Sequence, residues 1–147
     1  AGGITTLEDK SCGCVQKGGS AQIADVLGYG EAVTRKGLNL LSGPGNDLVS
    51  ATALTAAGAH LILFTTGRGT PFGAPAPTVK ISTNTALFEK KRGWIDFNAG
   101  TVAQGESLDS AGERLLDYVL SVASGEQTNA ERRGAREISI FKDGVVL

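Results

Sequence analysis

Short apolar runs alternate with segments of helical periodicity along the whole chain. Apolar positions that recur every three or four residues are typical of helices, and short apolar runs bounded by turn residues are typical of buried strands. The pattern predicts helices at residues 5–11, 20–31, 46–58, 84–91, 107–125 and 129–134. It predicts strands at residues 37–42, 59–64, 78–82 and 137–141. This alternation indicates an α/β fold.

Further features of the pattern bear on the sheet and on the number of domains. Residues 59–64 are apolar at nearly every position, as central strands of a parallel sheet are, because helices cover both faces. Thr5 and Glu8 have the spacing of a capping box, and Ser20 is a favoured N-cap residue, so each predicts a helix start. We find no repeat, low-complexity tract or long linker. The sequence therefore predicts a single domain over residues 1–147 with a mostly parallel sheet.

Charge and composition narrow the classes of function. The 14 basic and 15 acidic side chains give a net charge of -1, which offers no broad basic surface for nucleic acid or an anionic membrane. Neither a secretory signal nor an apolar run of about 18 residues is present. Cys12 and Cys14 are too close for a useful disulfide and fit a reducing compartment. We therefore expect a cytoplasmic protein, and the lack of methionine and the abrupt start at Ala1 indicate a piece of a longer one.

The residues that follow the apolar run 59–64 indicate a ligand site. They are Thr65, Thr66, Gly67, Arg68, Gly69 and Thr70. Ligands of open α/β sheets bind beyond the carboxyl ends of the strands. Glycines let the main chain approach a ligand, threonines offer hydroxyls, and Arg68 offers a planar fork for a carboxylate or phosphate. The alternative is that the glycines only turn the chain while Arg68 lies in solvent.

The glycines of this loop do not form a dinucleotide-binding fingerprint. Gly67, Gly69 and Gly73 are spaced one residue too long for G-x-G-x-x-G, and three prolines within residues 71–77 disfavour the helix start that would bind a pyrophosphate. The segment "GPGNDL" at residues 43–48 lacks a third glycine. We therefore expect no nucleotide cofactor.

Several longer segments resemble one enzyme family, both in sequence and in order. They are "AGGITTLEDKS", "KGG", "GLNLLSGPGND", "LFTTGRGTPFG", "VKISTNTALFEKK", "WIDFNAG" and "VASGEQTNAERRGAREISIFKDGV". Together they resemble the altronate dehydratases, within the wider family of galactarate dehydratases and altronate hydrolases. The resemblance runs from about Gly2 to the end of the chain, and the chain is similar to the C-terminal domain of such an enzyme.

The resemblance implies a hydro-lyase that removes water from D-altronate to give 2-dehydro-3-deoxy-D-gluconate. A domain of a galactarate dehydratase, or a non-catalytic assembly domain, is the alternative. The resemblance also implies a Rossmann-like three-layer α/β sandwich and a divalent metal, Fe(2+) or Mn(2+), in the intact enzyme. We expect the partners to be the sugar-acid substrate and the missing N-terminal and middle domains, and a homo-oligomer stays open. The isolated fragment is expected to fold without dehydrating altronate.

Dehydration next to a carboxylate requires a base, an acid and donors that stabilise an enolate. We expect Arg68 to clamp the substrate carboxylate, because a guanidinium can hold both of its oxygens. Substrate oxygens would then be held by the rest of the loop, Thr65, Thr66, Gly67, Gly69 and Thr70. Lys10 is the candidate catalytic base and Lys17 a candidate substrate-binding residue, although either could be the base if burial lowered its pKa. The alternative for both is a solvated lysine.

Polar residues also follow other short apolar segments. Thr83, Asn84, Asp96 and Asn98 could therefore reach the same end of the sheet and bind substrate. Asp96 is a candidate metal ligand or orienting group, whereas the alternative is an ordinary turn role. Lys80 lies within an apolar strand and either crosses to the site or extends its ammonium to solvent. Beyond this candidate, the metal ligands are unknown from the sequence.

His60 and the two cysteines are predicted to be structural. His60 is the only histidine and stands at the start of a strand, away from the loop with Arg68. Cys12 and Cys14 could ligate iron, but two thiolates are too few for a closed zinc or cluster site. We therefore expect small buried thiols, and imidazole chemistry would come from outside this chain.

Overall fold

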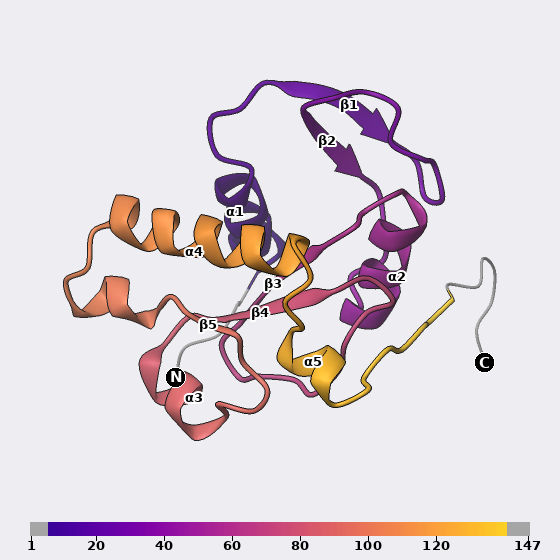
Figure 1. Cartoon of the computed structure of the whole chain (residues 1–147). Coiled ribbons are helices and arrows are strands. Elements are labelled where there is room, and N and C mark those ends of the chain that lie inside the picture. Colours follow the sequence, from indigo (N-terminus) through magenta and orange to yellow (C-terminus); the bar gives the residue numbers. More distant parts are fainter. Residues whose placement is uncertain (1–5, 141–147) are drawn as a thin grey trace. The chain divides into compact units, whose positions relative to one another are not determined.

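A computed structural model describes residues 6–140 of the chain. Within that range, five side chains lie outside the description: Leu7, Asp9, Lys10, Ser11 and Cys14. The predicted capping box of Thr5 and Glu8 therefore falls partly outside the described residues. The chain divides into two compact units, residues 1–42 and 43–147, whose elements are drawn in Figure 1. The prediction of a single domain stays a prediction. Among the described residues, no helix is long and apolar enough to cross a membrane.

In residues 6–42, the first unit contains one helix and a two-stranded sheet. Helix α1 spans Leu7–Lys17, β1 spans Ile23–Leu27 and β2 spans Leu38–Leu41. The two strands run parallel, with Ile23 opposite Leu38 and Leu27 opposite Leu41, and the register shifts between Ile23 and Asp25. The predicted strand at residues 37–42 is confirmed by β2.

The prediction of a helix at residues 20–31 is wrong, because this segment holds β1. Its apolar residues match helical spacing, but Gly28 and Gly30 interrupt the segment, and Gly30 has a φ of 83° that no helix contains. Glycine also costs about 1 kcal/mol relative to alanine in a helix. Parallel pairing with β2 gives the backbone its partners instead and continues past the strand, where Ser42 N donates to Leu27 O at 2.9 Å.

The second unit is built on a parallel sheet with the strand order β3-β4-β5. Strand β3 spans Ile62–Thr66, β4 spans Thr78–Ser82 and β5 spans Phe97–Asn98. The predicted strand at residues 78–82 coincides with β4, and the one at 59–64 begins later and extends through both threonines. Strand β5 was not predicted, because a strand of two residues is too short to show an alternating pattern. The strand predicted at 137–141 is wrong for residues 137–140, which are irregular, and residue 141 lies outside the described residues.

The helices of the second unit agree with the predicted helical segments. They are α2 (Asp47–Ala56), α3 (Thr85–Lys90), α4 (Leu108–Ala123) and α5 (Asn129–Arg132), with a 3-10 helix η1 at Gly100–Gln104. Polar side chains cap their starts: the Asn84 side chain accepts from Leu87 N, and the Ser107 hydroxyl accepts from Ser110 N. Such caps satisfy backbone donors that a helix leaves free in its first turn.

Helices cover both faces of the three-stranded sheet, so the second unit has three layers (Figure 1). On one face Ala51 of α2 packs with Ile62 of β3. On the other face Val122 of α4 packs with Val79 of β4. The predicted fold class, a Rossmann-like α/β sandwich with a mostly parallel sheet, is confirmed.

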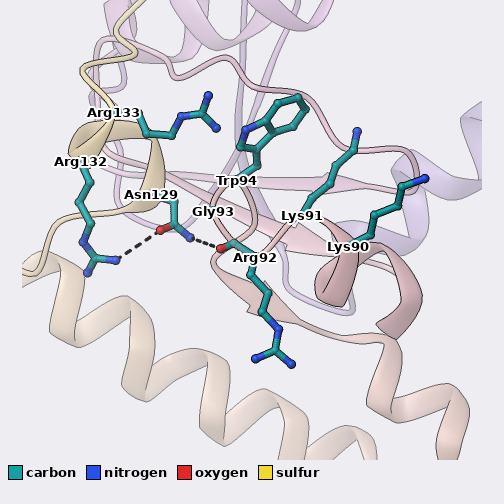
Figure 2. Close-up of a pocket in the computed structure, with 8 residues that line it drawn as sticks. All are labelled: Lys90, Lys91, Arg92, Gly93, Trp94, Asn129, Arg132 and Arg133. Atoms are coloured by element: carbon teal, nitrogen blue, oxygen red, sulfur yellow. Dashed lines mark hydrogen bonds between the residues drawn. The ribbon is translucent and has the colours of Figure 1, made fainter.

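The short helix α5 is fastened to the turn before β5 by Asn129 (Figure 2). The Asn129 side-chain amide donates to Arg92 O at 3.2 Å and to Ile95 O at 2.8 Å. The Asn129 backbone N–H donates to Asp96 Oδ1 at 2.7 Å. These bonds hold the segments around residues 92–96 and 129–133 together, although they are distant in sequence.

Candidate active site

The carboxyl ends of β3, β4 and β5 lie together, as parallel pairing requires. Thr66 is opposite Ser82, and Ser82 is opposite Asn98. Backbone and side-chain bonds join the three ends: Thr83 N donates to Thr66 O at 3.1 Å, and Ser82 Oγ donates to Asn98 Oδ1 at 3.4 Å. The structure therefore brings the predicted residues Thr66, Thr83 and Asn98 to one edge of the sheet, next to Ser82.

The loop after β3 has a fixed conformation that presents Arg68 to solvent. Gly69 has a φ of 78°, which favours glycine, and its N–H donates to Thr66 Oγ1 at 2.8 Å. The Arg68 side chain is exposed, while its carbonyl accepts a hydrogen bond of 3.0 Å from Lys91 Nζ. Gly67 O accepts from Asn84 Nδ2 at 3.3 Å. The Arg68 guanidinium is thus carried on a braced loop and is available for an anion.

The hydroxyls of the loop differ in how available they are. Thr65 is exposed at the end of β3, whereas the Thr66 hydroxyl already accepts from Gly69 N. The half-buried Thr70 contributes its carbonyl, which accepts from Lys80 Nζ at 3.0 Å. Thr65 is therefore the hydroxyl of this loop best placed to contact a ligand, and Thr66 and Thr70 hold the loop.

Lys80 lies beneath this loop and is almost fully buried, with 1% of its surface exposed. It is opposite Phe64 in the register of β3 and β4, so its side chain starts from the face that α2 covers. Burial lowers the pKa of Lys80, and Arg133 lowers it further, while Asp96 and Glu137 raise it. From the sequence, two positions were open for the Lys80 ammonium, at the site or in solvent. In the structure it is buried and contacts the loop through Thr70 O. A charged residue inside an apolar strand was the signal in the sequence.

Asp96 does not lie in the loop region but joins three elements inside the unit. Its Oδ2 accepts from Lys80 N at 2.8 Å, and its Oδ1 accepts from Asn129 N at 2.7 Å and from Tyr118 OH at 3.5 Å. Burial raises the pKa of Asp96, although the bonds from Asn129 N and Lys80 N lower it. Burial also raises the pKa of Tyr118 to about 12. Both carboxylate oxygens are occupied, so this geometry favours a structural role over the predicted role in binding.

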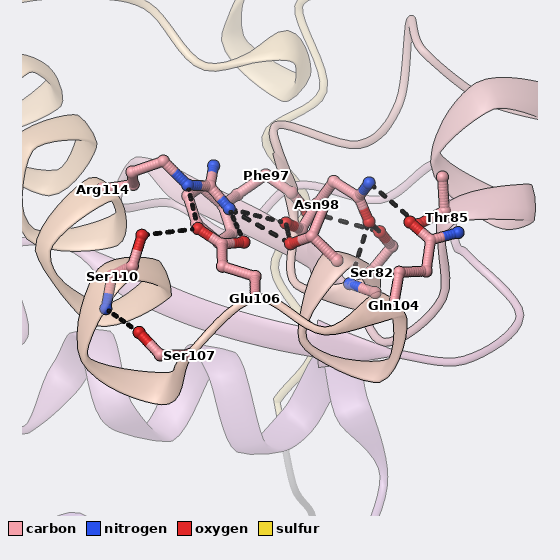
Figure 3. A network of polar contacts seen from close by, with 11 residues as sticks. Ser82, Thr85, Phe97, Asn98, Gln104, Glu106, Ser107, Ser110 and Arg114 are labelled. Atoms are coloured by element: carbon pink, nitrogen blue, oxygen red, sulfur yellow. Dashed lines mark hydrogen bonds and ion pairs between the residues drawn. The ribbon is translucent and has the colours of Figure 1, made fainter.

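Asn98 and its neighbours form a polar network at the end of β5 (Figure 3). Asn98 Nδ2 donates to Thr85 Oγ1 at 3.1 Å, and Asn98 Oδ1 accepts from Gly100 N at 2.9 Å. The side chain of Asn98 is thereby engaged in shaping the sheet edge, as that of Asn84 is in capping α3.

Arg114 of α4 and Glu106 complete this network, and sequence reasoning missed both. Arg114 Nε and Nη2 donate to the two Glu106 oxygens at 2.8 Å each, and the guanidinium lies 4.8 Å from the centre of the Phe97 ring. The hydrogen bond from Arg114 lowers the pKa of Glu106 to about 2. Figure 3 shows the fork-to-carboxylate arrangement, which fastens α4 to the segment after β5.

The remaining candidates lie elsewhere or outside the described atoms. Lys10 and Lys17 belong to α1 in the first unit, where Lys17 is exposed and the Lys10 side chain is outside the description. Their roles stay predictions. The prediction of a buried thiol is wrong for Cys12, which is exposed, and the Cys14 side chain is not among the described ones. His60 is exposed just before β3, away from the loop with Arg68.

Comparison with known proteins gives matches over nearly the whole chain. Residues 1–146 match the family described as D-galactarate/Altronate dehydratase, C-terminal. The chain is 55% identical over its full length to the altronate dehydratases of Escherichia coli (strain K12) and Bacillus subtilis (strain 168). It is 38% identical, over 86% of its length, to the galactarate dehydratase (L-threo-forming) of Escherichia coli. The chain spans only 30% of the length of either altronate dehydratase and 24% of the galactarate dehydratase.

Proposed function

This chain belongs to the D-galactarate/altronate dehydratase C-terminal family, and from that membership we propose that it is the C-terminal part of an altronate dehydratase. The observation that carries the proposal is the 55% identity over the full chain to two altronate dehydratases, against 38% to a galactarate dehydratase. The proposed reaction removes water from D-altronate to give 2-dehydro-3-deoxy-D-gluconate, and we propose the cytoplasm as its compartment. Galactarate is the second candidate substrate.

The reaction sets the tasks that residues of the site can perform. The carbon next to the carboxylate loses a proton, the hydroxyl on the neighbouring carbon leaves as water, and the resulting enol becomes the ketone. Negative charge builds up on the carboxylate as the proton leaves, so fixed cationic donors there lower the barrier. The exposed Arg68 guanidinium on its braced loop fits that task, and the exposed Thr65 hydroxyl fits a contact with a substrate oxygen.

In the proposed site Lys80 does not contact the substrate but supports the loop that carries Arg68. Its ammonium holds Thr70 O, two residues from Arg68. Its positive charge, buried in a low-dielectric interior, also adds to the potential felt by an anion at the loop. We therefore assign Lys80 as a positioning residue.

The divalent metal expected from the family resemblance does not fit the described part of the chain. Within residues 6–140, apart from the side chains left out, no group of three His, Cys, Asp or Glu side chains could hold a metal ion. Both oxygens of Asp96, the candidate ligand, accept hydrogen bonds from within the unit. The steps proposed for Arg68, Thr65 and Lys80 therefore involve no metal.

A role in assembly is the second candidate function, and the first unit contains the observation that favours it. Val15, Ile23 and Leu40 are exposed apolar side chains around a hollow of about 290 Å³. Exposed apolar surface of this kind is typical of contact with another protein or domain. The remaining domains of the longer enzyme are the partners that we propose for it.

One experiment compares the longer enzyme that carries this chain with the 147-residue chain alone. The appearance of the 2-dehydro-3-deoxy acid is followed with D-altronate and with galactarate, with iron or manganese added. We expect turnover by the longer enzyme with a higher kcat/KM for altronate, and a folded but inactive 147-residue chain. A higher kcat/KM for galactarate would contradict the proposed substrate. Comparable turnover by the chain alone would contradict the expectation that activity needs the remaining domains of the longer enzyme.

A further inference from the structure

A hollow with five cationic side chains lies between the turn after α3 and helix α5 (Figure 2). Its volume is about 620 Å³. Its walls are formed by Lys90, Lys91, Arg92, Gly93, Trp94, Asn129, Arg132 and Arg133. No carboxylate is among these residues, although the chain has 15 acidic side chains. Positive charge is therefore concentrated at this place in a chain whose net charge is -1.

Backbone and amide bonds hold the walls of the hollow in place, and two of the cationic groups also make hydrogen bonds, Arg132 Nη1 to Asn129 Oδ1 at 3.4 Å and Lys91 Nζ to Arg68 O at 3.0 Å. Asn129 ties α5 to the opposite wall through Arg92 O and Ile95 O, and Asp96 accepts from Asn129 N. The Trp94 N–H donates to Lys91 O at 2.8 Å, which closes the turn. The cationic side chains thus project from a fixed backbone frame.

Two of the cations flank the Trp94 indole, as Figure 2 shows. Lys91 Nζ is 4.6 Å and Arg133 Cζ is 5.2 Å from the ring. Among the five cations, which all lie in the described part, only Arg132 has an ion pair, 3.5 Å from Glu126. Like charges gathered in this way repel one another, and an anion between them would relieve the repulsion.

We propose that this hollow binds a small oxyanion that carries at least two negative charges, such as pyrophosphate or a dicarboxylate. Arginine forks and lysine ammonium groups are the side chains that recognise phosphoryl and carboxylate oxygens. The cations line one bounded hollow and do not extend as a stripe, which fits a small molecule and not a nucleic acid. The proposal goes beyond the dehydratase function and does not rest on it.

Trp94 is the only tryptophan of the chain, so its fluorescence reports on this hollow directly. The 147-residue chain is titrated at constant ionic strength with pyrophosphate, with succinate, a dicarboxylate that is no candidate substrate, and with acetate as the monovalent control. Calorimetry of the same titrations gives a readout that does not depend on the indole. The variants are Lys91→Gln with Arg133→Gln, and Lys90→Gln with Arg92→Gln at exposed positions. Arg136→Gln is the matched control, because it removes an exposed cation that lies beyond the end of α5 and outside the hollow.

We expect a saturable change with the multivalent anions, none with acetate, and at least tenfold weaker binding by each double variant. Arg136→Gln should bind within about twofold of the unaltered chain. Tighter binding of pyrophosphate would identify a phosphorylated ligand, and tighter binding of succinate would identify a dicarboxylate. A signal that follows ionic strength alone, or an equal loss in Arg136→Gln, would overturn the proposal. If Lys91→Gln with Arg133→Gln fails to fold, the variant with exposed substitutions decides between these outcomes.

Discussion

Asp96→Asn tests whether this carboxylate joins the elements of the second unit or serves the reaction. The substitution keeps the shape of the side chain but replaces one oxygen by an NH2 group. In the structure Oδ2 accepts from Lys80 N at 2.8 Å and Oδ1 accepts from Asn129 N at 2.7 Å. Whichever oxygen is replaced, one backbone donor faces another donor. The substitution therefore breaks either the bond to β4 or the bond to α5.

The size of the effect follows from these two bonds. A buried N–H left without an acceptor costs roughly 1 to 3 kcal/mol, and bonds to a charged acceptor lie at the upper end. Removal of the charge offsets part of this loss in the free energy of unfolding, because burial disfavours the ionised form and raises the pKa of Asp96. We expect a net loss of about 2 kcal/mol. For a chain of this length that corresponds to a decrease in melting temperature of roughly 4 to 8 °C.

Urea unfolding followed by circular dichroism measures this loss. Asp117→Asn is the matched control, since Asp117 is exposed on α4, and it should unfold at the same urea concentration as the unaltered chain. If Asp96→Asn were equally stable, the structural role of these bonds would be refuted. If Asp96→Asn left stability unchanged but abolished dehydratase activity in the longer enzyme, Asp96 would have a role in substrate binding or catalysis.

Two further predictions use the same unfolding measurement. Burial lowers the pKa of Lys80 below the 10.5 of the unfolded chain. Just below pH 10.5 the unfolded state therefore binds more protons than the folded state, and stability rises with pH. Lys80→Met should flatten that rise, and parallel curves of stability against pH for the two proteins would contradict the burial of the charge. A Cβ on Gly100 would lie 2.2 Å from Thr85 N, so Gly100→Ala should destabilise by about 3 kcal/mol. Gly112→Ala, which meets no atom within 4 Å in α4, should stabilise by about 0.5 to 1 kcal/mol, and equal effects of the two substitutions would contradict the packing around η1.

Sequence periodicity predicted the elements that are long or strictly patterned. Strand β4 was predicted at its observed bounds, because two buried apolar residues and turn residues on both sides define it. Helix α4 was predicted from its apolar face, and in the structure Ser107 caps its start. Strand β1 was mistaken for a helix, because Ile23, Val26 and Leu27 have helical spacing and only the pairing with β2 shows that the segment is extended. Strand β5 is too short for any periodic signal.

The site shows the same division between local and spatial information. Parallel strands end at the same edge of a sheet, so the approach of Thr66, Asn84 and Asn98 could be predicted from their positions after strands. The sequence could not show that the side chain of Asn84 caps α3 or that the side chain of Asn98 accepts a hydrogen bond from Gly100 N at the sheet edge. It also could not show that residues 90–94 and 129–133 form one cationic hollow, because only the folded chain brings these segments together.

The central claim is that the loop after β3 binds the carboxylate of a sugar acid through Arg68. The most direct test is the kcat/KM of Arg68→Lys for D-altronate in the longer enzyme, with Arg136→Lys as control. Lysine keeps the charge but not the fork, and loss of a preorganised donor costs roughly 2 to 4 kcal/mol in the transition state. We therefore expect kcat/KM to fall by a factor of roughly 30 to 1,000, with an unchanged melting temperature because the side chain is exposed. An unchanged kcat/KM would contradict the carboxylate clamp.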